Sequence, residues 1–260
     1  MQKTLRKVLR AVADYDPDYY DMYADPNEAF FAQLYLERIR SHAEAAGIRP
    51  GATVLEAGCQ AGRLVVPLAK MGFEVTGVDT SGLALRRARE HAKEAGVEAT
   101  FVQGKVEEVL AARASGRYDV VVCAEVLYLC RQYREILRTL AGAVRPGGLL
   151  CVSHRPKFYY LLEALRQYDL KSAVEVQRRS EGPFRGAAYY NWQTEEELRQ
   201  LYDSVGLRWL AWYPIDRYAW LGGTSPATLT SEQRDQLLRL ELESPDAAGC
   251  ARYVLVIAAR

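Results

Sequence analysis

A long apolar run and a secretory leader are both missing from this sequence. No run of about 18 apolar residues occurs along the 260-residue chain, so we expect no transmembrane helix. The N-terminal segment has basic residues from Lys3 to Arg10 but lacks the apolar core of a secretory signal. The net charge of +1 provides no general attraction to nucleic acid or to a membrane surface. These absences favour a cytoplasmic protein that acts on a small molecule.

Cysteine is scarce, and no metal-binding spacing is present. The five cysteines form no C-x-x-C pair, and three of them lie in or beside apolar strand runs, which predicts reduced, buried thiols. Histidine, cysteine and carboxylate residues show no spacing typical of a metal site, so we expect no metal. Hydrophobic residues make up 49% of the chain and charged residues 26%, as in an ordinary globular protein.

Strands alternate with helices through the middle of the chain. We expect strands over 54–56, 74–79, 100–102, 118–123 and 149–153, with helices over 61–71, 81–94, 106–114 and 132–144 between them. The strands are nearly continuous apolar runs, typical of strands covered on both faces. This order predicts an α/β fold with a doubly wound, mostly parallel sheet and helices on both faces.

The segments on either side of this core suggest additions to it. Residues 1–50 predict an N-terminal helical extension or lid, with helices over 4–13 and 26–46 around an acidic, tyrosine-rich loop. Residues 51–260 form the main domain, with insertions at about 154–193 and 213–249. The remaining elements are helices over 194–206 and 231–242 and strands over 207–212 and 252–258.

The turn after the first strand reads Glu56-Ala-Gly58-Cys59-Gln60-Ala-Gly62. A strand that turns tightly into a helix surrounds a small crevice with backbone N–H groups, and glycine allows close approach. The Glu56 carboxylate would repel a pyrophosphate but suits a ligand with an ammonium or sulfonium group. The dinucleotide pattern G-x-G-x-x-G fails here, because Gln60 and Arg63 occupy its second and third glycine positions.

This turn resembles the first motif of the class I S-adenosylmethionine-dependent methyltransferases, an acidic residue followed by G-x-G-x-G. Gln60 stands where the middle glycine of that motif usually stands, so its side chain either points outward or narrows the pocket. The resemblance covers roughly residues 50–153 and is weaker from 194 to the end. It implies a seven-stranded sheet with an antiparallel final strand.

Asp79 ends the second strand, 79 − 58 = 21 residues after Gly58. At that distance a carboxylate reaches the ribose hydroxyls of a bound nucleoside, although Asp79 could instead cap the next helix. With Thr80 it is a predicted cofactor residue.

Three further loops match the family. Lys105 and Val106 occupy the adenine-binding position, but a lysine cannot accept the hydrogen bond that the family's acidic residue accepts. By resemblance, Ala124 and Glu125 flank the cofactor, while Leu129 replaces a histidine common in quinone-type relatives. Residues 145–148, Arg-Pro-Gly-Gly, match the loop before the fifth strand.

The acceptor site is expected at the same strand ends. His154 and Tyr128 are the candidate catalytic residues, since an imidazole there could take a proton from the acceptor. The aromatic candidates for substrate contact are Tyr20, Tyr160, Tyr190 and Trp192. A structural histidine and aromatic packing within a lid are the alternatives.

Together these motifs predict a methyltransferase that uses S-adenosylmethionine and forms S-adenosylhomocysteine. We expect in-line transfer to a small organic acceptor, with nucleic acid and membrane disfavoured as partners. Two alternatives stay open: a protein that binds S-adenosylmethionine without transferring its methyl group, and a methyltransferase for RNA or protein. The sequence does not indicate the oligomeric state.

Overall fold

The computed structural model describes residues 19–112, 117–243 and 249–260. The helix expected over 4–13 and the first part of the acidic loop lie outside these residues.

A seven-stranded sheet forms the centre of the fold, in the order β3-β2-β1-β4-β5-β9-β8. The strands are β1 (Thr53–Ala57), β2 (Glu74–Asp79), β3 (Thr100–Gln103), β4 (Tyr118–Cys123), β5 (Val144–His154), β8 (Arg208–Ile215) and β9 (Tyr253–Ala259). Strands β1 to β5 pair in parallel, whereas β9 runs antiparallel to both of its neighbours. The mostly parallel sheet with an antiparallel final strand is therefore confirmed.

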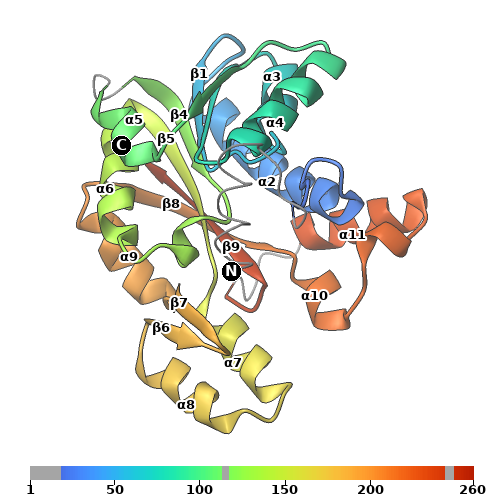
Figure 1. Ribbon diagram of the computed structural model, residues 1–260, viewed down its shortest axis with the longest axis vertical. Coiled ribbons are helices and arrows are strands. Elements are labelled where there is room, and N and C mark those ends of the chain that lie inside the picture. Colours follow the sequence, from blue (N-terminus) through green and yellow to red (C-terminus); the bar gives the residue numbers. More distant parts are fainter. Residues whose placement is uncertain (1–18, 113–116, 244–248) are drawn as a thin grey trace, which may run out of the picture.

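Helices cover both faces of this sheet (Figure 1). They are α2 (Pro26–Ala45), α3 (Val65–Lys70), α4 (Gly82–Glu94), α5 (Val106–Ala111), α6 (Tyr133–Ala143) and α9 (Glu195–Asp203). Alternate strand residues enter separate cores, because successive side chains point to opposite faces. Val54 packs in the core of α2, α3 and α4, whereas its neighbour Leu55 packs in the core of α6 and α9.

The first insertion contains a strand hairpin in addition to the helical stretches that the sequence predicts, and the second contains the helix expected over 231–242. The first contains α7 (Lys157–Leu165), α8 (Leu170–Arg178) and a hairpin of β6 (Glu181–Phe184) and β7 (Ala187–Asn191). It projects from one end of the sheet around a small core of its own (Figure 1). The second contains α10 (Tyr218–Gly222), the 3-10 turn η2 (Pro226–Thr228) and α11 (Ser231–Glu243). A further 3-10 turn, η1 (Leu127–Leu129), follows β4.

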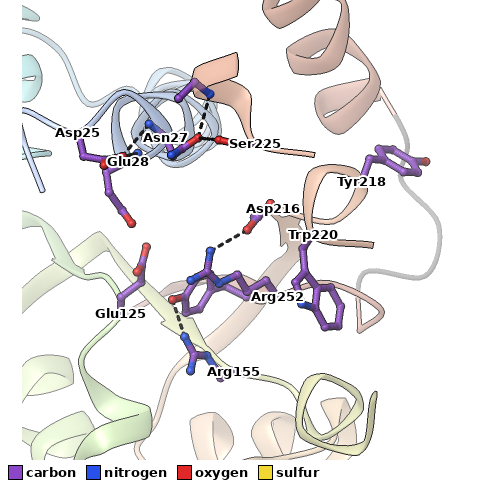
Figure 2. Close-up of polar contacts among 12 residues, drawn as sticks. Asp25, Asn27, Glu28, Glu125, Arg155, Asp216, Tyr218, Trp220, Ser225 and Arg252 are labelled. Carbon is purple, nitrogen blue, oxygen red and sulfur yellow. Dashed lines mark hydrogen bonds and ion pairs between the residues drawn. The ribbon is translucent and has the colours of Figure 1, made fainter. Parts of the chain in front are cut away.

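The second insertion is joined to the N-terminal helix α2. Asn27 Oδ1 accepts hydrogen bonds from Ser225 Oγ at 2.8 Å and from Ala227 N at 2.9 Å (Figure 2). Apolar residues of α11, among them Leu237 and Leu238, pack against the core that contains α2. The N-terminal helix and an element more than 180 residues later in the chain therefore form one wall beside the strand ends.

Candidate active site

A cavity of about 760 Å³ lies where β1, β2 and β4 end. The predicted cofactor residues line it with one exception, Gly62, and the candidate Tyr128 also lines it. A hollow of similar volume, about 770 Å³, lies beside Thr53 and Glu74 at the opposite, amino ends of the strands. Ligands of open parallel sheets bind beyond the carboxyl ends of the strands, so the first cavity is the candidate site.

The glycine turn shapes one wall of this cavity. Gly58 has φ +79°, and a Cβ at this position would overlap the Val126 side chain, so the turn requires glycine there. Gly62 has φ +87°, and a Cβ added at this position would lie 3.4 Å from the Ala88 Cβ of α4. The absence of a side chain therefore lets the turn pack closely against α4. Because residues 61–64 form turns around the cavity, the helix predicted from 61 begins only at Val65.

Gln60 lines the cavity, and its side chain binds the N-terminal segment beside it. Its Nε2 donates to the Tyr20 carbonyl, and its Oε1 accepts from Met22 N at 3.3 Å. Met22 itself lines the cavity. Gln60 has φ +44°, a conformation that a non-glycine residue adopts at a cost, and these bonds offset that cost. A side chain in place of the family's middle glycine thus fastens a strap, residues 20–22, beside the cavity.

Asp79 holds the turn rather than capping the following helix. Its Oδ2 accepts from Gln60 N at 2.9 Å and its Oδ1 accepts from Ser81 N at 2.8 Å. The N-cap of α4 is Ser81, whose side chain accepts from Ala84 N. A carboxylate oxygen has two lone pairs, so each Asp79 oxygen can still accept from a hydroxyl in the cavity.

Glu56 is a buried carboxylate with an unused oxygen. Its side chain is 3% exposed, and its Oε2 has no hydrogen-bond partner among the described residues. Burial raises the pKa of Glu56 to about 8. A buried carboxylate is costly unless a cation or a hydrogen-bond donor pairs with it. The residue therefore fits a ligand that brings a positive charge to the end of β1.

Arg63 forms a buried ion-pair triad that the sequence reasoning missed. Its Nη2 lies 2.8 Å from Glu125 Oε1, and its Nη1 pairs with Glu28 Oε2 of α2. Burial raises the pKa of Glu28 to about 7. The two carboxylates face one another in Figure 2. Two carboxylates share one cation, so the triad becomes net negative as the pH rises through about 7, which favours a cationic ligand nearby.

The adenine end of the cavity is built differently from the family pattern. Lys105 has a largely exposed side chain that lies 3.5 Å from Glu108. Glu107, in the first turn of α5, lines the cavity beside Lys105 and Val106. An acid two residues further along could therefore accept the bond that Lys105 cannot accept. Glu107, an acid two residues after the expected position, is the sequence signal that could have indicated this arrangement.

His154 does not reach the cavity, so its expected role as a base is not supported. It is fully buried on β5, and its Nε2 lies 2.9 Å from Tyr202 Oη of α9. Burial lowers its pKa to about 3, so the ring is neutral at ordinary pH. His154 packs in the sheet because the last residue of β5 points to the covered face, not to the strand-end edge.

Two of the four aromatic candidates form the core of the first insertion. Tyr160 and Trp192 are each 1% exposed, and Trp192 Nε1 donates to the carbonyl of Arg179 at 2.8 Å. Their positions support packing within a lid, the alternative reading, rather than substrate contact. Tyr190 stacks on the cavity residue Tyr128, with ring centres 6.3 Å apart. Tyr20 is half exposed in the strap.

Two kinds of feature are absent from the described residues. Within 19–112, 117–243 and 249–260, no helix is long and apolar enough to cross a membrane. The same part of the chain contains no group of three or more histidine, cysteine or carboxylate residues arranged to hold a metal ion.

The strand order, the acid Glu56 near the end of β1 and the carboxylate Asp79 at the end of β2 together point to one class of protein. In its sheet order the chain has the fold of solved S-adenosylmethionine-dependent methyltransferases, and it is similar to proteins of this class over the matched region.

Comparisons with known proteins agree with this class. Residues 54–148 match the family model described as "Methyltransferase domain". A ubiquinone biosynthesis O-methyltransferase of Proteus mirabilis is 32% identical over 162 residues, 61% of this chain and 65% of that relative. Other relatives with the same name are matched over 39% to 49% of their length. The chain therefore matches less than two thirds of these relatives.

Solved structures share the fold along the whole chain. The magnesium protoporphyrin IX methyltransferase of Synechocystis, solved with bound S-adenosylhomocysteine, is 18% identical with a TM-score of 0.61, and the match covers 100% of both chains. The 1,6-didemethyltoxoflavin-N1-methyltransferase of Burkholderia thailandensis, solved with its acceptor and S-adenosylhomocysteine, is 17% identical with a TM-score of 0.59. That match covers 100% of this chain and 88% of the other.

Proposed function

We propose that this protein is an S-adenosylmethionine-dependent methyltransferase that acts on a small organic acceptor. The observation that carries the proposal is the unpaired, buried carboxylate of Glu56 in a strand-end cavity of this class. The matched family model and the names of the relatives support the reaction type.

The residues present fit the cofactor. Glu56 would hold its ammonium group, and the remaining lone pairs of Asp79 would accept from the ribose hydroxyls. Because Gly58 has no side chain, the turn after β1 can lie close to Val126. The triad of Glu28, Arg63 and Glu125 adds negative charge beside a cavity that would hold a sulfonium.

When bound, S-adenosylmethionine supplies an electrophilic methyl group and leaves as S-adenosylhomocysteine. The protein's own contribution is to align the acceptor in line with that methyl and to exclude water. Proximity of this kind contributes roughly 7–11 kcal/mol, whereas a positioned base contributes about 10²–10⁴-fold. Burial raises the pKa of Tyr128, so its hydroxyl stays protonated and can orient an acceptor by a hydrogen bond. Because the reaction relies mainly on proximity, it is compatible with a buried His154 that does not act as a base.

The first insertion argues against an RNA acceptor. The sequence shows a mild excess of basic residues in it, which would suit a phosphate backbone. Two of these bases pair with acids of the adjoining helix, which offsets the excess: Arg166 lies 3.1 Å from Glu163, and Arg179 lies 3.1 Å from Glu175. A small acceptor is therefore the better supported class. We extend the proposal to a cytoplasmic location, which the five unpaired cysteines fit.

Calorimetry and a transfer assay test the proposal. The purified chain should bind S-adenosylmethionine, and Asp79→Ala should weaken that binding. Transfer of a labelled methyl group to a compound in a small-molecule extract should depend on Asp79. Binding without transfer to any fraction would favour the non-enzymatic alternative. Binding of nicotinamide nucleotides in place of S-adenosylmethionine would contradict the proposal altogether.

A further inference from the structure

Arg155 lies at the strand-end edge, directly after β5, in a cage of aromatic rings. Its guanidinium carbon is 4.3 Å from the ring centre of Tyr128, 4.5 Å from that of Tyr159 and 4.7 Å from that of Tyr253. The three rings come from η1, α7 and β9, so three distant parts of the chain enclose one cation. Arg155 Nη2 donates to Tyr253 Oη at 2.5 Å (Figure 2).

This cation has no carboxylate partner among the described residues. Its neighbours do have partners: Arg63 pairs with Glu28 and Glu125, and Arg252 lies 3.2 Å from Asp216. Arg155 Nε is buried and has no hydrogen-bond partner within that part of the chain. A guanidinium has five N–H donors in a planar fork that matches a carboxylate or a phosphate. Burying a guanidinium whose N–H donors are mostly without acceptors costs free energy, unless a ligand supplies an anionic acceptor.

Tyr128 connects this cation with the cofactor cavity. The tyrosine lines the cavity and carries Arg155 over its ring. The acidic residues Glu56 and Glu125 line the cavity, and Arg155 lies over the ring of Tyr128 without a carboxylate partner among the described residues. In Figure 2 Glu125 and Arg155 extend from neighbouring elements in different directions. A molecule bound beside Tyr128 would present one end to the methyl donor and the other to Arg155.

We propose that Arg155 binds an anionic group, a carboxylate or a phosphate, on the methyl acceptor. The inference rests on the proposed function and narrows its substrate class to small organic anions. Arg155 acts here in binding and specificity, and the methylated atom lies elsewhere in the acceptor. Tyr128 and Tyr159 flank the guanidinium, so an acceptor with an aromatic or other flat body would pack against them.

The test measures binding of three probes to the full chain saturated with S-adenosylhomocysteine. The probes are benzoate, phenyl phosphate and the uncharged benzamide. We expect one of the two anions to bind at least about tenfold more tightly than benzamide, because a charge-assisted hydrogen bond is at stake. Arg155→Met should remove the preference, and Arg155→Lys, which keeps the charge but not the fork, should keep part of it. The preferred anion distinguishes a carboxylate from a phosphate.

Arg179→Met is the matched control, because Arg179 lies in the first insertion and its side chain is 61% exposed. It should leave the preference unchanged. Thermal melting and S-adenosylhomocysteine binding show whether each variant folds and keeps its cofactor site. If Arg155→Met does not fold, the wild-type preference and Arg155→Lys decide the question. Equal binding of all three probes by the wild type, or no binding of any, overturns the inference.

A second arm uses the reaction. An extract is separated by anion exchange before it is incubated with enzyme and labelled S-adenosylmethionine, since methylation could itself remove a charge. We expect the label in products of the anionic fraction, and loss of most of it in Arg155→Met. Label only in the neutral or cationic fraction contradicts the anionic acceptor but leaves the methyltransferase intact. Failure to bind S-adenosylmethionine contradicts the proposed function instead.

Discussion

The two halves of the strand-end edge are built in different ways. The cofactor half takes Glu56, Asp79 and Glu125 from three neighbouring strands of one continuous stretch, and it collects negative charge. The half that we propose for the acceptor brings Tyr128, Tyr159 and Tyr253 around Arg155, which has no carboxylate partner within the described part of the chain. The first arrangement follows from local motifs, whereas the second needs the loop after β4, the sheet strand β9 and the first insertion to come together.

The largest expected effect comes from removing Arg63, the cation of the buried triad with Glu28 and Glu125. Arg63→Met leaves Glu28 and Glu125 buried without their cation, and removing one partner of a buried pair costs about 3–5 kcal/mol. We expect this loss in the free energy of unfolding at pH 8, measured by urea denaturation. The loss should shrink towards pH 5, because the pKa of Glu28 is about 7 and its protonated carboxyl group needs no cation.

The matched control for this change is Arg87→Met. Arg87 forms an exposed pair with Glu90 at 2.8 Å, and its side chain is 52% exposed. Removing such a pair costs about 0–1 kcal/mol. If both variants lost equal stability, burial would not be the reason for the importance of Arg63.

The next effect concerns the unpaired carboxylate of the cofactor half. Glu56→Gln should weaken S-adenosylmethionine binding by roughly 1.5–3 kcal/mol, about 10- to 150-fold, because a hydrogen bond to a charged group is lost. Calorimetry of both proteins with S-adenosylmethionine measures the difference. An unchanged affinity would mean that the ammonium group binds elsewhere.

The pKa of Glu56 gives this prediction a pH signature. Its ordinary value of 4.5 rises to about 8 in the folded protein. Only the carboxylate pairs with a cation, so affinity should increase between pH 6 and about 7.5, by up to about tenfold per unit. Proton release on binding, measured in buffers of different ionisation enthalpy, should vanish in Glu56→Gln. A raised pKa also means that Glu56 stabilises the fold fully below pH 4.5 and loses this effect as pH rises through 8.

A smaller effect is expected at the strap. Gln60→Gly removes the conformational cost of a non-glycine residue at positive φ, but it also removes the hydrogen bonds to Tyr20 and Met22. The net change in binding should be about 0.5–1.5 kcal/mol, seen as faster cofactor dissociation in stopped flow. Hydrogen exchange at the Met22 amide should also increase. Slower dissociation would show that the strap hinders rather than retains the cofactor.

The smallest effect is expected at His154. Its pKa of about 3 keeps it neutral across the working range, so it should produce no step in the pH–rate profile between pH 5 and 8. His154→Gln should change kcat per folded molecule by less than about twofold, because the ring contacts Tyr202 and not the cavity. A hundredfold loss without unfolding would restore it as a catalytic candidate.

Several features of the fold and site could be predicted because their causes are local. Apolar runs between segments of helical periodicity predicted the position of every strand in the seven-stranded sheet. The bounds of β2 and β4 agree with those predicted. Backbone geometry at Gly58 and the carboxylates of Glu56 and Asp79 follow from neighbours in the chain. The role of Gln60 could not be chosen beforehand, because its partners lie about 40 residues earlier.

The succession of strands and helices along the chain, the glycine turn and two acids at strand ends could be predicted from the sequence, because secondary structure depends largely on nearby residues. Folding alone placed Glu28 on Arg63, buried His154 and caged Arg155. The contacts of these three residues with Arg63, Tyr202 and Tyr253 span 35, 48 and 98 positions, and the burial that determines their charge exists only once the chain has packed.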